Sequence, residues 1–202
     1  MACVFRRLLW LLFCAPSIAH ALTAGPNYPG TGTDDSSFGT TVWLNPGNIT
    51  SSDNNYASLT SVAGVNTHYL AASNFGFSIP SSATILGIQV EGERQAICGG
   101  GCTVDSRVRI IKGGVVGSTE KSTGASWPSG GIDVYDSFGG SSDLWGETWI
   151  YTDINASNFG GVLSPTGILA GALSEVDTCR ITVTYTGGSQ TRSGWLHIMQ
   201  NN

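Results

Sequence analysis

The chain has 202 residues with a formal net charge of −5, and 28 of the residues are glycine. This length fits a single domain with a proper core, and the acidity argues against nucleic acids and anionic membranes as partners. Charged residues make up only 11%. Together with the abundance of Ser and Thr, that composition is typical of a β-rich extracellular domain.

Residues 1–21 have the pattern of a secretory signal peptide. Arg6 and Arg7 precede a short apolar run, and Ala19-His20-Ala21 offers a small-x-small cleavage site after Ala21. Cleavage would leave seven basic and fourteen acidic residues, a formal charge of −7. The apolar run is shorter than the roughly 20 residues a membrane helix needs. We therefore expect a secreted protein, extracellular or at the cell surface, without membrane insertion.

Residues 22–39 predict an extended N-terminal arm, because they are rich in Gly, Pro, Ser and Thr and lack a hydrophobic period. From residue 40 to 187 the apolar spacing is two wherever it is clear, which indicates strands with one buried face. Residues 83–97 and 103–114 predict a long hairpin around the glycine loop CGGGC.

Further strands are expected at 40–44, 56–62, 67–73, 115–118, 131–135, 148–151, 159–163 and 175–186. TDINASN predicts one helical turn capped by Thr152 or Asp153. We therefore predict an all-β fold, a two-sheet antiparallel β-sandwich of the jelly-roll kind over residues 40–187. We expect Arg107 and Arg109 on the outer face of their strand, with Arg94 opposite, and paired across the strands with Glu91 or Glu93.

Cys98 and Cys102 stand at the two ends of the glycine loop and predict a disulfide that closes the hairpin, since export permits disulfides. A metal site there has only His68 and His197 to complete it in the mature chain. Cys179 alternates with apolar residues and is expected in the core.

Several stretches together resemble a known pattern: WLNPGNITSSDNNYAS, THYLAASNFGFSIPSSATILGIQVEGER, GGSSDLWGETWIYTDINASNFGGVL and VDTCRITVTY. The chain resembles, over residues 38–187, a domain pattern of environmental bacterial secreted proteins and phage structural proteins. The resemblance implies a jelly-roll sandwich used as a building or binding module, and it implies no catalytic residues. The CGGGC loop and the tail at 188–202 depart from the pattern.

The stretch at 139–151 allows two interpretations, a sugar-binding loop or a corner of the core, and the resemblance favours the corner. Candidate ligand-binding residues are Trp127, Trp145, Asp143 and Glu147, because exposed rings stack on sugars and carboxylates bond their hydroxyls. Trp127 is the better candidate for an exposed ring. The tail 188–202 carries the apolar residues Trp195, Leu196, Ile198 and Met199, which are candidates for assembly.

Catalysis is not expected: no G-x-S-x-G motif occurs, and the acids near residues 133–153 lie in polar turns. A structural calcium ion is the cofactor that the oxygen-rich loops SDNN and DSFGGSSD suggest. The favoured hypothesis is a secreted, non-catalytic subunit of a fibre, coat or matrix. It would act by self-assembly or adhesion, with copies of itself or other extracellular proteins as partners and strand addition by its termini. The alternative is a carbohydrate-binding module that binds polysaccharide through exposed tryptophans.

Overall fold

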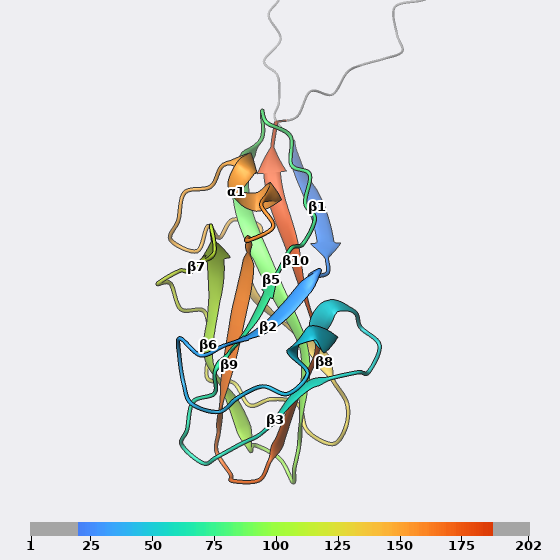
Figure 1. Cartoon of the computed structure of the whole chain (residues 1–202). Coiled ribbons are helices and arrows are strands. Elements are labelled where there is room, and N and C mark those ends of the chain that lie inside the picture. The colour runs from blue at the N-terminus through green and yellow to red at the C-terminus, as the bar shows by residue number, and fades with distance from the viewer. Residues whose placement is uncertain (1–19, 188–202) are drawn as a thin grey trace, which may run out of the picture.

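Two antiparallel β-sheets pack face to face in the computed structural model, which describes residues 20–187 (Figure 1). The first sheet has the order β1-β10-β5-β8, with β3 also paired to β10, and the second has the order β2-β4-β9-β6-β7. The strands are β1 (Ala21–Asn27), β2 (Thr31–Asp35), β3 (Ala57–Thr60), β4 (Tyr69–Ser73), β5 (Thr84–Ile97), β6 (Thr103–Lys112), β7 (Val115–Val116), β8 (Val134–Gly140), β9 (Gly160–Gly167) and β10 (Leu173–Thr186). The predicted all-β, two-sheet sandwich is confirmed.

The chain passes back and forth between the sheets. The first strand, β1, pairs with the last, β10, and the connections from β1 to β2, β5 to β6 and β9 to β10 all change sheet. This wrapping is the jelly-roll order, with β3 and β4 added to it. Its consequence is that β1 begins and β10 ends at one end of the sandwich, while the β5–β6 and β9–β10 turns lie at the other end (Figure 1).

The expected N-terminal arm is wrong. Residues 21–27 form β1, which pairs with β10, and residues 31–35 form β2, which pairs with β4. Both are edge strands of their sheets and are held mainly by main-chain ladders, so they need little hydrophobic period and tolerate Pro26. Deleting this segment would remove an edge strand from each sheet.

The expected hairpin of residues 83–97 and 103–114 is also wrong, although both strands exist. β5 belongs to the first sheet and β6 to the second, so residues 98–102 cross between sheets. Period-two alternation indicates a buried face, but it does not say which sheet a strand joins. The predicted disulfide is present between Cys98 and Cys102, with 6.4 Å between their Cα atoms, and it closes this crossing.

Two of the shorter predicted strands, at 40–44 and 148–151, do not form. Side-chain contacts rather than strand ladders hold these two segments in place. Thr41 and Leu44 make only isolated bridges, and Tyr151–Asn155 forms the short helix α1 directly after Trp149. The remaining helical element is the 3-10 turn η1 (Pro46–Thr50). The predicted helical turn is confirmed, but the predicted cap is wrong: the N-cap position is held by Ile150 and not by Thr152 or Asp153. Its backbone amide donates to Asp153 Oδ2 over 3.0 Å.

A buried ion pair joins the two sheets. Arg94 of β5 is fully buried and turned inward, against the expectation of an outer-face arginine, and it forms a two-pronged pair with Asp105 of β6. Arg94 also pairs with Asp136 of β8, and its guanidinium lies 4.9 Å from the centre of the Trp127 ring. Arg107 and Arg109 do lie on the surface, but the predicted partners are wrong: both arginines pair with Glu120 and not with Glu91 or Glu93.

We expect Arg94→Met to destabilise the fold by about 3–5 kcal/mol, because Asp105 is left buried without a counter-charge. Adding Asp105→Asn to that variant should restore part of the loss, since the asparagine oxygen still accepts from Trp127. Arg180→Met, which breaks the half-buried pair with Glu91, is the control and should cost about 1 kcal/mol or less. Chemical denaturation measures all three. A double variant less stable than Arg94→Met would contradict this account.

Candidate functional site

The two candidate sugar-stacking tryptophans are core residues. Trp127 is 2% exposed and donates from Nε1 to Asp105 Oδ1 over 2.9 Å, so the prediction of an exposed loop ring is wrong. Trp145 is 1% exposed and donates to the Ile88 carbonyl over 2.8 Å. Each indole has its N–H satisfied internally, as buried tryptophans require. The corner interpretation of residues 139–151 therefore holds.

The candidate acids of that stretch serve the same corner. Asp143 pairs with Lys121 over 2.7 Å and accepts from the Trp145 amide over 2.8 Å. Burial works to raise the pKa of Asp143, but the bonds from Lys121 and the Trp145 amide hold it below its ordinary value. Glu147 is half-buried on the turn before Trp149. The candidate assembly residues Trp195, Leu196, Ile198 and Met199 lie outside the described residues.

Potential nucleophiles are poorly placed for catalysis. The Cys179 thiol lines an apolar cavity between the sheets, and burial raises its pKa to about 12, so it stays protonated at neutral pH. His68 Nδ1 lies 2.8 Å from Asp34 Oδ2, which gives the base and orienting acid of a triad. Among the described residues no hydroxyl or thiol is hydrogen-bonded to the His68 imidazole; the Thr67 hydroxyl donates to the His68 backbone carbonyl instead.

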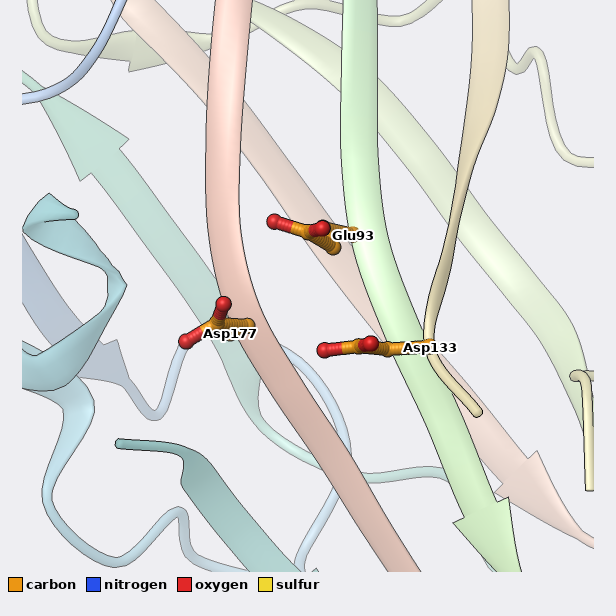
Figure 2. A group of neighbouring side chains, drawn as sticks. All are labelled: Glu93, Asp133 and Asp177. Atoms are coloured by element: carbon orange, nitrogen blue, oxygen red, sulfur yellow. The ribbon is translucent and has the colours of Figure 1, made fainter. Parts of the chain in front are cut away.

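Three carboxylates converge on the outer face of the first sheet, from three separate segments. They belong to Glu93 of β5, Asp177 of β10 and Asp133 just before β8, and one oxygen of each lies within 4.8 Å of the others (Figure 2). None of the ion pairs in the described part of the chain includes any of the three. Negative charge is thus gathered here without a protein cation to offset it.

The sheet structure explains how these acids meet. Glu93 follows the outward alternation of β5, and Asp177 lies in a β-bulge of β10, between the pairs that Val176 and Thr178 make with β5. A bulge redirects a side chain and leaves no sign in single-sequence periodicity. The alternation of buried and exposed residues along β5 predicts that Glu93 faces outward. Nothing in the sequence predicts that Asp177 lies beside it.

Burial shapes the charge of this carboxylate cluster. It raises the pKa of Asp177 and of neighbouring Glu175 above their ordinary values, although Asp177 also accepts hydrogen bonds from the amides of Asp53 and Asn54. Burial, followed by the charge of Asp133, raises the pKa of Tyr56 to about 12. Glu93 Oε2 is buried and has no hydrogen-bond partner.

The oxygen donors of Glu93, Asp133 and Asp177 are those that a hard cation such as Ca²⁺ prefers, although three carboxylates fall short of its usual six to eight oxygen ligands. The two loops that suggested calcium contribute less than expected. In SDNN, Asp53 is occupied by hydrogen bonds with Ser51 and Asn55. In DSFGGSSD, Asp136 pairs with Arg94 and Asp143 with Lys121.

Tyrosines surround the carboxylates on the same face. Tyr56 donates to Asp133 over 3.2 Å, and Tyr135 is hydrogen-bonded to Glu93 and Tyr28. The Arg180 guanidinium lies 3.7 Å from the centre of the Tyr135 ring, and Tyr28 is 43% exposed. This tyrosine–carboxylate face is the described surface where an accessible aromatic ring lies beside hydrogen-bonding groups.

A second surface lies at the end of the sandwich that holds the β9–β10 turn. Large aliphatic side chains between 48% and 55% exposed gather there, and we call them the apolar tip: Val62, Ile97, Ile168 and Leu169. Backbone bonds tie their segments together, from Ile168 N to the Cys102 carbonyl over 2.7 Å and from Gly64 N to the Gly167 carbonyl over 2.8 Å. Exposed apolar groups gathered in this way mark interaction surfaces.

We expect the melting temperature to rise when the pH falls from 7 toward 5. Asp177 and Glu175 have raised pKa values in the folded protein, so the native state binds protons more tightly than the unfolded chain. Their stabilising contribution is complete below the unfolded pKa values and is lost as the pH rises through the folded ones. Asp177→Asn should flatten this dependence.

Thermal melts of both proteins across this pH range, with calcium chelated, measure the effect. Asp153→Asn, at a carboxyl beside Lys112 and away from the cluster, is the control and should keep the wild-type slope. A wild-type melting temperature that falls steadily on acidification would contradict the assignment.

Comparisons with protein-family models, curated proteins and solved structures found no match. Among the described residues no helix is long and apolar enough to cross a membrane. Function must therefore be argued from the two surfaces, the tyrosine–carboxylate face and the apolar tip.

Proposed function

We propose that this protein is a secreted, non-catalytic β-sandwich that acts by self-assembly, as a subunit of an extracellular fibre, coat or matrix. The observation that carries the proposal is the apolar tip. Four large aliphatic side chains are about half exposed at one end of a domain whose chain enters and leaves at the other end. In a soluble monomer these apolar side chains stay exposed to water, which is unfavourable, whereas a contact between subunits would bury them.

Other features agree with a building role. The disulfide closes the sheet-crossing segment beside the tip, and the buried Arg94–Asp105 pair links the sheets, so the tip is presented by a rigid body. The nucleophiles described above lack the geometry of a hydrolase. A glycosidase would need two carboxyl groups about 5–10 Å apart across a cleft, whereas Glu93, Asp133 and Asp177 crowd within 4.8 Å of one another on a sheet face.

The mature chain, residues 22–202, should form assemblies whose mass in light scattering rises with concentration in multiples of the monomer, with filaments or sheets in negative stain. The reason is that burying the tip removes apolar surface from water. Both measurements should be repeated with a calcium chelator, which tests whether an ion takes part. A monomer at all concentrations, with and without calcium, would overturn the proposal.

Carbohydrate binding is the second candidate, and the observation that favours it is the tyrosine–carboxylate face rather than any tryptophan. Tyr28 offers an exposed ring, and Glu93, Asp133 and Arg180 offer hydrogen-bonding groups beside it. In affinity gels containing polysaccharides, Tyr28→Ala should abolish any retardation of the wild-type protein. Tyr151→Ala, at the first position of α1, is the control. Equal retardation of wild type and Tyr28→Ala would exclude this face.

A further inference from the structure

We infer that the C-terminal segment 188–202 of one copy docks on the apolar tip of the next copy, so that copies join head to tail. The inference rests on the assembly function proposed above and names the surface and the segment that carry it. It starts from the positions of the two chain ends and of the tip.

The segment leaves the domain far from its own tip. Residue 187 follows β10 directly, and Thr186 pairs with Ala21 at the end of the sandwich where β1 begins (Figure 1). The tip residue Ile97 pairs with Leu173, at the opposite end of β10. β10 has 14 residues. At about 3.3 Å per residue, a strand of that length separates the two ends by about 40 Å.

Chain length then favours docking between copies over docking within one copy. A fully extended chain covers at most about 3.6 Å per residue. Trp195 therefore reaches no further than about 29 Å from residue 187, and Leu196 no further than about 32 Å. Neither of the first two apolar residues of the segment can cover the tip of its own copy. The tip of a neighbour has no such limit.

The chemistry of the two partners agrees. The segment holds four large apolar residues within five positions, Trp195, Leu196, Ile198 and Met199, and these match the aliphatic character of the tip. It carries Arg192 and no acid, whereas residues 22–187 hold six basic and fourteen acidic residues, a formal charge of −8. Arg192 can pair with one of these acids on a neighbouring domain, while the four apolar residues supply the contact area.

The geometry also sets the form of the assembly. Each copy offers one segment and one tip, at opposite ends, so the contact is heterologous and leaves a free segment and a free tip after every addition. Such a contact extends into a filament when the rotation between copies does not close a ring.

Two variants of the mature chain test this inference. The first ends at Gly187 and keeps the tip. The second keeps the segment and carries Ile168→Ser with Leu169→Ser. Val115→Ser with Ile150→Ser is the matched control, because these two side chains are also exposed but belong to the β6–β7 turn and the start of α1. Thermal melts should show that all variants are folded; if the tip pair lowers the melting temperature, Ile97→Ser replaces it.

We expect each of the first two variants alone to be monomeric at concentrations at least tenfold above those at which the wild type and the control assemble. Mixed together they should form a 1:1 dimer that grows no further, because only one intact segment and one intact tip can meet. Light scattering of the mixture measures its mass.

The outcomes separate the inference from the function it rests on. A monomeric wild type would overturn the assembly function. A wild type that assembles together with both variants, or a mixture that stays monomeric, would overturn the inference alone. Loss of assembly on truncation but not on tip substitution would also overturn it, because the segment would then dock elsewhere.

Discussion

The ion pair between Arg94 and Asp105 is the constraint on which this sandwich depends. The two residues lie in different sheets, neither side chain reaches water, and a buried charge is tolerated only when its partner is held in place. The pair therefore fixes how β5 sits over β6. It also positions Trp127 and Asp136, and so it ties the segment between β7 and β8 to the core. The disulfide at the nearby crossing reinforces the same link from outside.

Much of the fold could be predicted, because a strand with one buried face carries apolar residues at every second position. The alternation of β5, β6 and β10 was visible, and so was the proximity of Cys98 to Cys102. The pairing of strands into sheets was predicted wrongly. The strands at 84–97 and 103–112 look like a hairpin because they are neighbours in sequence, yet the sheet that a strand joins depends on distant partners. β1 and β2 were missed because edge strands held by main-chain bonds bury few side chains and so carry little apolar pattern.

The candidate site was predicted less well than the fold, for a related reason. The sequence allowed Trp145 to be either a core corner, which was favoured, or a ligand group, and it lies in the core because Gly139 adopts a positive φ of 72° and leaves no room for a Cβ beside the Trp145 ring. The glycine is there so that the tryptophan can enter the core. The three acids of the carboxylate cluster and the exposed Tyr28 come from segments far apart in sequence, and the buried Asp177 reaches the cluster through a bulge.

The pairing of β1 with β10 has a consequence for how the protein is made. The first strand cannot complete its ladder until the last has been synthesised, since Leu22 pairs with Tyr185 across almost the whole domain. Contacts between such distant residues slow folding, because a long loop must close, at a cost in chain entropy, before the contacts can stabilise the chain. A chain built in this way cannot complete its first sheet before Tyr185 has been synthesised. For the export proposed above, that delay suits a narrow translocation pore, which admits only an unfolded polypeptide.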